Sequence, residues 1–154
     1  AGIGHLITFI RKYHRTIQFV AYEIDTTLEN NQLTEANAEW YYEDFLSADI
    51  ESYDTIIGNP PYIKQGGTNI YLKFINKCID YLNTNGEMIF ILPTDFLQNT
   101  MSCSIRNKML SIGSITDIYH PNNDRLFDNA TIDVIVVRYQ KNIFTNELMF
   151  NDEK

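Results

Sequence analysis

Residues Asn59 to Tyr62, which read Asn-Pro-Pro-Tyr, bring together hydrogen-bond acceptors, a stiff backbone and an aromatic ring. Pro60 and Pro61 fix their φ angles and have no N–H group, so the segment presents carbonyl oxygens without donors. The Asn59 side-chain oxygen adds a second kind of acceptor. Two close acceptors suit an –NH2 group, and Tyr62 offers a flat face for stacking. The tetrapeptide predicts chemistry on an amino group; the alternative is a proline turn with Tyr62 in the core.

Weaker signals precede this tetrapeptide. Gly2 and Gly4 open a predicted helix, where a backbone can approach an anionic ligand closely. Glu23 ends a predicted strand and could accept hydrogen bonds from ribose hydroxyls. Asp44 and Phe45 follow another strand and could bind an adenine amino group and ring. Each has an ordinary alternative, namely a tight turn, a solvated acid and a loop acid beside a core Phe. One nucleoside could nevertheless touch all three places.

Hydrophobic patterning predicts the elements that position these residues. Helices are expected at 6–13, from a cap at Asp25 or Thr26 to about 36, at 69–82 and at 101–110. Strands are expected at 16–23, 39–42, 53–58, 88–92, 115–119 and 132–139, with a loop at 64–68. Asn85-Gly86 is expected to end the third helix, and Pro93 the fourth strand. The alternation predicts an α/β fold with a mostly parallel sheet, and the helix-free link between the last two strands permits an antiparallel pair at one edge.

Composition narrows the class of protein. A length of 154 residues fits one domain, and a net charge of −8 argues against a free-standing nucleic-acid binder. Cys78 and Cys103 are interpreted as reduced thiols, and no metal site is predicted. No apolar run is long enough to span a membrane and no signal peptide is seen, so the cytoplasm is the expected location. The opening Ala-Gly-Ile-Gly, without Met, suggests a fragment of a longer protein.

The chain resembles the S-adenosylmethionine-dependent DNA adenine-N6 methyltransferases of bacterial restriction-modification systems, over nearly all of its residues. "AGIG" is similar to their methionine-binding loop, "YEID" to the ribose site, "EDF" to the cofactor-adenine site and "NPPY" to the catalytic motif. Downstream, "NIYLKFINKCIDYLNTNGEMIFILPTDFL" and "LFDNATIDVIVVRYQK" are similar to later family segments, the second to the final hairpin. The motif order resembles the gamma-like subgroup, which appends a target-recognition domain at the C-terminus.

The resemblance implies direct transfer of a methyl group from S-adenosylmethionine to a flipped-out adenine, with no covalent enzyme intermediate and no metal. It implies catalytic roles for Asn59, Pro60 and Tyr62, and stacking of the target base on Tyr62 and Phe127. Double-stranded DNA is the implied partner, with a restriction endonuclease or specificity subunit as a further one. The implied cofactor contacts are Ala1, Gly2, Gly4, Glu23, Ile24, Asp44, Phe45, Asn59 and Pro61.

The implied fold is a Rossmann-like class I methyltransferase sheet with an antiparallel C-terminal edge hairpin. Residues 1–154 would be a partial catalytic domain, because neither the family's first central strand nor its target-recognition domain is recognisable. Four alternatives stay open: methylation of a release-factor glutamine, of ribosomal-RNA adenine or of cytosine N4, and a degenerate DNA- or partner-binding module. The acidic segment expected of the glutamine group is absent, the cytosine group usually begins its tetrapeptide with Ser, and intact Asn59 and Tyr62 argue against degeneration.

Overall fold

The computed structural model describes residues 2, 4–31, 38–121 and 132–153. The chain divides into two compact units, Ala1–Asp49 and Ile50–Lys154, called here the N-terminal and C-terminal units. The prediction that residues 1–154 form one partial catalytic domain stays a prediction.

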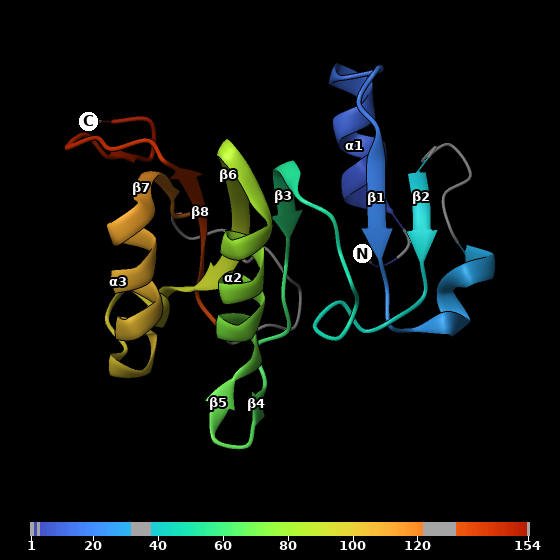
Figure 1. Ribbon diagram of the computed structural model, residues 1–154, viewed down its shortest axis with the longest axis horizontal. Helices are drawn as coiled ribbons and strands as arrows, with labels where there is room; N and C mark the ends of the chain where they lie inside the picture. The colour runs from blue at the N-terminus through green and yellow to red at the C-terminus, as the bar shows by residue number, and fades with distance from the viewer. Residues whose placement is uncertain (1, 3, 32–37, 122–131, 154) are drawn as a thin grey trace. The chain divides into compact units, whose positions relative to one another are not determined.

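The N-terminal unit places a helix before two parallel strands (Figure 1). It contains α1 (His5–Tyr13), β1 (Phe19–Tyr22), the 3₁₀ helix η1 (Thr26–Asn31) and β2 (Ala38–Tyr41). Strands β1 and β2 pair in parallel, with Phe19 opposite Ala38. The backbone N–H of Thr27 donates to Asp25 Oδ1 over 3.0 Å, which confirms Asp25 as the cap of the helical turn. The predicted helix is described only as this short 3₁₀ helix, because residues 32–37 lie outside the described ranges.

The C-terminal unit is built on a five-stranded sheet in the order β3-β6-β8-β7-β9. Its strands are β3 (Tyr53–Gly58), β6 (Leu82–Pro93), β7 (Gly113–Tyr119), β8 (Val134–Lys141) and β9 (Met149–Phe150). Since β3 is parallel to β6, β7 is parallel to β9 and β8 is antiparallel to both β6 and β7, only β8 is reversed. The mostly parallel α/β sheet and its antiparallel C-terminal hairpin are confirmed, although β8 lies inside the sheet order and β9 forms the edge.

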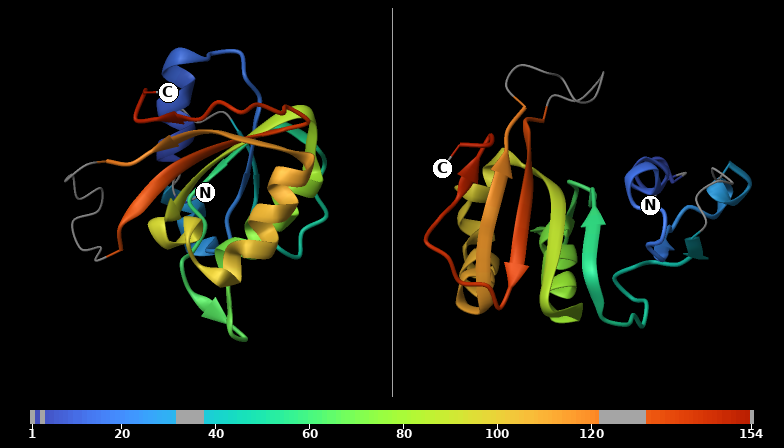
Figure 2. Two further views of the ribbon diagram at one scale, coloured as in Figure 1. Left: turned by 90° about the vertical axis from the view of Figure 1, so that its left-hand side faces the viewer. Right: turned by 90° about the horizontal axis from the view of Figure 1, so that it is seen from above.

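Two helices cover one face of this sheet, as Figure 2 shows. They are α2 (Ile70–Tyr81) and α3 (Cys103–Ile112), with the 3₁₀ helices η2 (Thr94–Leu97) and η3 (Thr100–Ser102) between β6 and α3. Alternate residues of β6, namely Met88, Phe90 and Leu92, are buried on the helix side. Helix α2 contributes Ile75 and Ile79 to this core, and both are fully buried.

Two local predictions in this unit were wrong. Helix α2 ends at Tyr81, and β6 begins at once at Leu82, six residues before the predicted strand. Asn85, with a φ of 64°, and Gly86 form a bend where the register between β3 and β6 shifts, so they do not end the helix. The expected loop at 64–68 is a hairpin of β4 (Lys64–Gln65) and β5 (Thr68–Asn69).

Each unit has a strand paired on one side only. Within the described residues, β1 pairs with β2 alone and β3 pairs with β6 alone. The central strand that the family resemblance implies is not among the described strands. No helix in the described ranges is long and apolar enough to cross a membrane.

Candidate active site

In the N-terminal unit, the Glu23 carboxylate joins the glycine turn to the end of β1. Its Oε2 accepts a hydrogen bond from the Gly2 N–H over 2.6 Å, and its Oε1 accepts one from the Asp25 N–H over 2.9 Å. Gly2 and Gly4 have φ angles of 60° and 92°, which only glycine adopts at little cost. Gly4 is also the N-cap residue of α1. The structure therefore brings together the predicted glycine turn and the predicted ribose acceptor.

The charge state of Glu23 follows from these contacts. Partial burial raises the pKa of Glu23, but hydrogen bonds from the Asp25 and Gly2 N–H groups to the carboxylate lower it. The net effect lowers the pKa from 4.5 to about 2. The side chain is therefore an anionic acceptor at neutral pH. Carboxylate oxygens are acceptors only, so any ligand group that binds Glu23 has to be a hydrogen-bond donor.

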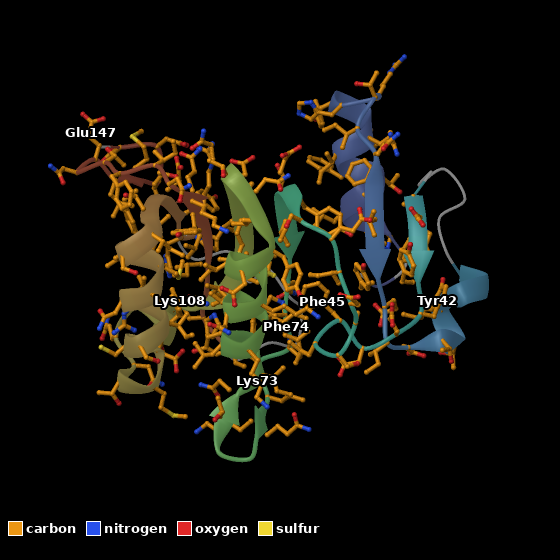
Figure 3. The ribbon with its side chains drawn as sticks, in the orientation of Figure 1. Tyr42, Phe45, Lys73, Phe74, Lys108 and Glu147 are labelled. Carbon is orange, nitrogen blue, oxygen red and sulfur yellow. The ribbon has the colours of Figure 1, made fainter. Side chains whose placement is uncertain are left out.

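The end of β2 lies beside the end of β1. The Glu23 N–H donates to the Tyr41 carbonyl over 3.0 Å, and the Tyr22 ring meets the Phe45 ring edge-on, with centroids 5.5 Å apart. Asp44 Oδ1 accepts from the Leu46 N–H over 2.9 Å, which fixes the turn that carries Phe45. Figure 3 labels Phe45 where the chain has left β2.

Two further predicted cofactor residues, Ile24 and Ala1, belong to this unit. Ile24 follows Glu23 and is 68% exposed. Ala1 lies outside the described residues.

In the C-terminal unit, Asn59 to Tyr62 leave the carboxyl end of β3. Asn59 and Pro61 are exposed, Pro60 is buried and Tyr62 is half-buried. Asn59 directly follows Gly58, which is paired with Phe90 of β6. A Cβ at Gly58 would stand 3.2 Å from the Phe90 ring, so the glycine lets β3 pack closely just before the tetrapeptide. The Asn59 amide is thus at the surface, at the end of a strand supported by the core.

Tyr62 ties the tetrapeptide to β6. Its hydroxyl oxygen lies 2.7 Å from Asn59 Oδ1 and 2.8 Å from the carbonyl oxygen of Ile91. Burial raises the pKa of Tyr62 to about 12, so the phenol is neutral at physiological pH. Its ring packs edge-to-face with Tyr71, which is 1% exposed and in turn packs edge-to-face with Phe96. The structure therefore joins Asn59 and Tyr62 and adds two partners that the residue types did not indicate, Ile91 and Tyr71.

Phe127, the second predicted base contact, lies outside the described residues. The predicted cofactor residues Asn59 and Pro61 belong to the C-terminal unit, whereas the others belong to the N-terminal unit. A joint site of both units stays a prediction.

Metal and thiol chemistry find no support in the described ranges. No group of three or more His, Cys, Asp or Glu side chains there could hold a metal ion. Cys78 and Cys103 are free, as predicted. Burial raises the pKa of the Cys78 thiol to about 12, so this residue is not a reactive thiolate.

Comparison with known proteins identifies the family. Residues 6–127 match the Eco57I restriction-modification methylase family. The chain belongs to this family. It is similar to the type II methyltransferase M.AccI of Acinetobacter calcoaceticus, with 24% identity over 184 aligned residues that cover 98% of the chain and 33% of that protein. The chain spans less than half the length of the curated relatives it matches.

Solved structures support the fold of this Eco57I-family chain. The methyltransferase subunit of a type I restriction-modification system from Streptococcus thermophilus has a TM-score of 0.76 and 21% identity, covering 97% of this chain and 40% of that one. A protein from Listeria monocytogenes is assigned to the class I S-adenosylmethionine-dependent methyltransferases. It has a TM-score of 0.74 and 14% identity, covering 94% of this chain and 52% of that one. The class I fold prediction is confirmed. Family and fold together also confirm S-adenosylmethionine as the cofactor of this methyltransferase type.

Proposed function

We propose that the full-length protein transfers a methyl group from S-adenosylmethionine to the N6 amino group of adenine in double-stranded DNA. The observation that carries this proposal is the exposed Asn59 amide at the carboxyl end of β3, followed by two prolines and held beside Tyr62. Similar proteins are named type II methyltransferases and a modification methylase, which favours a DNA substrate. Membership of the Eco57I family supports the same reaction class.

The residues of the tetrapeptide would hold the target amine. S-adenosylmethionine supplies a methyl group already activated on a sulfonium. The Asn59 side-chain oxygen and the Pro60 carbonyl accept the two amine hydrogens and hold them out of the ring plane, which returns the lone pair to the nitrogen. The same two oxygens stabilise the positive charge that develops there. Positioning supplies most of the remaining rate, because no further activation of the methyl group is required.

The N-terminal unit would hold the cofactor. Gly2 and Gly4 allow close backbone approach, and nothing lies within 4 Å of the place where a Gly2 side chain would begin. Glu23 is anionic and would accept hydrogen bonds from the ribose hydroxyls. Asp44 and Phe45 would bind the adenine ring of the cofactor. Ala1, Ile24, Asn59 and Pro61 complete the proposed set.

The target base would have to leave the duplex to reach Asn59, as in other enzymes that modify a base. Tyr62 and Phe127 would replace its lost stacking, which is worth about 1–3 kcal/mol per base on an aromatic platform. The half-buried Tyr62 ring is already anchored at its hydroxyl, so little freedom is lost when a base stacks on it.

DNA binding by the full-length protein would draw on more than these residues. The net charge of −8 is unfavourable for gripping phosphates. A target-recognition domain, a specificity subunit or a restriction endonuclease could supply the basic surface. Relatives with 23–43% of their length covered leave ample room for such a region in proteins of this kind. A DNA substrate would place the activity in the cytoplasm.

The test is to incubate the full-length protein with labelled S-adenosylmethionine, DNA and, in parallel, a translation release factor. Labelled N6-methyladenine is expected in the DNA. N4-methylcytosine, label on release-factor glutamine, or cofactor binding without transfer would each overturn the adenine assignment.

A matched pair of variants tests Asn59 itself. Asn59→Ala should lower the transfer rate at least ~100-fold with cofactor affinity unchanged, because one of two preorganised acceptors is lost. Asn83→Ala removes an amide that donates to Asp54 over 2.8 Å at the start of β3, and should leave transfer unchanged. An active Asn59→Ala protein would exclude the proposed role of Asn59.

A further inference from the structure

The Tyr62 hydroxyl lies between two oxygen atoms. Asn59 Oδ1 is 2.7 Å from it and the Ile91 carbonyl oxygen is 2.8 Å from it. A phenol carries one proton, and sharing it between two acceptors weakens both contacts. With Oδ1 toward the hydroxyl, two acceptors therefore compete for a single proton, and at most one of the two contacts is a full-strength hydrogen bond.

The two competing groups differ in what else they can do. The backbone carbonyl of Ile91 can only accept. The Asn59 amide has an acceptor end and a donor end of nearly the same size, so a half-turn about its Cβ–Cγ bond exchanges oxygen and nitrogen without changing the space occupied. After this half-turn, Nδ2 donates to the Tyr62 oxygen, Tyr62 donates to Ile91, and every contact is satisfied.

We propose that the Tyr62 hydroxyl is a positioning group that keeps the nitrogen of the Asn59 amide turned toward the protein and the oxygen turned toward the substrate. The proposal rests on the proposed function in one respect, that the substrate binds at Asn59. It adds a reason for the choice of substrate. An outward oxygen accepts from an –NH2 group, whereas an outward nitrogen would favour a carbonyl.

The chain of contacts from the Ile91 carbonyl through the Tyr62 hydroxyl to the Asn59 amide, called here the relay, has a rigid support. Ile91 lies in β6 between Phe90 and Leu92, which are 2% and 0% exposed, and it is paired with Val136 of β8. The Tyr62 ring is held from the side by Tyr71, with centroids 6.2 Å apart at an interplanar angle of 88°. Because neither end of the relay can shift far, the amide orientation is preorganised before substrate binds.

The kinetic test is a double-mutant cycle in the full-length protein. Tyr62→Phe keeps the ring for stacking but removes the hydroxyl, and should slow the single-turnover methyl-transfer rate about 10-fold, as expected for one lost orienting hydrogen bond. Asn59→Asp has two equivalent oxygens, so no orientation is wrong. In that background, Tyr62→Phe should change the rate by less than about 2-fold. Equal losses in both backgrounds would overturn the proposal.

Two controls separate positioning from stability and from base binding. Tyr139→Phe removes a buried hydroxyl that donates to the Met109 carbonyl over 3.1 Å in the same unit, so it should lower stability but leave the transfer rate unchanged. Extrusion of the target base, followed by the fluorescence of 2-aminopurine, should be the same in the Tyr62→Phe and wild-type proteins. A loss of extrusion in Tyr62→Phe would assign the effect to stacking and overturn the positioning role.

A spectroscopic readout needs neither DNA nor activity. In full-length protein with isotope-labelled asparagine, the Asn59 side-chain N–H protons should show a nuclear Overhauser contact to the Tyr62 ring and slowed exchange with water. In Tyr62→Phe the Overhauser contact to the ring should weaken and the slowed exchange should be lost, whereas both should be kept in Tyr139→Phe. Asn59 protons that lack this contact in the wild type would overturn the relay, even if the protein methylates adenine. Presence of the contact without methylation would overturn the proposed function alone.

Discussion

The two units of the chain hold their candidate functional groups in different ways. In the C-terminal unit, Tyr62 and Asn59 stand on a strand pair with a fully buried core that includes Ile75 and Met88. In the described part of the N-terminal unit, the buried hydrophobic residues are only Ala21 and Ala48. Glu23 and Asp44 are held there by backbone hydrogen bonds instead. We infer that the proposed amine-binding groups are preformed, whereas the proposed cofactor-binding groups depend on a few polar contacts.

The largest expected difference between the units is in stability. Ile75→Ala in α2 removes a side chain that is 0% exposed and should cost about 2–5 kcal/mol, because a cavity remains in the core. Ile17→Ala makes the same chemical change in the N-terminal unit, where Ile17 is 43% exposed, and should cost less than about 1 kcal/mol. Denaturant unfolding of both variants measures the contrast. Equal losses would show that the N-terminal unit depends on buried contacts as strongly as the C-terminal unit does.

The next difference is between cofactor affinity and turnover. Glu23→Gln should raise the KM for S-adenosylmethionine about 10- to 100-fold, because hydrogen bonds to a charged acceptor are replaced by weaker ones. The rate at saturating cofactor should stay within about 3-fold of wild type, since Glu23 is not proposed to touch the target amine. Asn59→Ala should give the opposite pattern.

Glu39→Gln is the control for Glu23→Gln. Glu39 is an exposed carboxylate of β2 that accepts a hydrogen bond from the Tyr41 hydroxyl over 2.6 Å. Its substitution removes the same charge from the same unit and should leave the KM unchanged. An equal rise in KM for both variants would assign the effect to net charge and not to the contacts of Glu23.

Sequence patterning predicted the elements of the C-terminal unit well where apolar runs are long. The strand at 53–58 has the predicted bounds, and the core of β6 is the predicted "MIFIL". The same reasoning failed at Asn85-Gly86, because a glycine bend inside a strand has the same local signature as a helix stop. It also missed β9, a two-residue strand whose pairing with β7 is decided by tertiary contacts.

The residue types of the candidate site stand out in the sequence, but the contacts between them do not. Asn59 and Tyr62 stand out because two prolines separate them, and the structure does join their side chains. The bond from Tyr62 to the Ile91 carbonyl spans 29 positions in the sequence. It depends on the register of β3 against β6, and a backbone carbonyl carries no side-chain signal. For the same reason, the Gly2–Glu23 hydrogen bond could not be read from the two residues alone.

The last expected differences are in pH dependence, and they fall at opposite ends of the pH scale. The folded-state pKa of Glu23 is lowered from 4.5 to about 2, so the carboxylate stabilises the fold fully above pH 4.5 and loses this contribution as the pH falls toward 2. The unfolding free energy of wild type relative to Glu23→Gln should therefore be constant near neutral pH and decrease below 4.5. A constant difference down to pH 2 would mean that the backbone bonds to Glu23 do not favour its charged form.

Tyr62 should change the unfolding free energy at alkaline pH instead of acid pH. Burial raises its pKa from 10 to about 12, so the neutral phenol stabilises the fold fully below pH 10 and loses this contribution as the pH rises toward 12. Wild type should lose stability relative to Tyr62→Phe only over that alkaline interval, and Glu23→Gln should not alter it. Unfolding curves for the three proteins across the pH range measure the acid and the alkaline changes in unfolding free energy. If substitution of Glu23 altered the alkaline change, Glu23 and Tyr62 would be energetically coupled. The contrast between a preformed proposed amine site and a separately held proposed cofactor site would then fail.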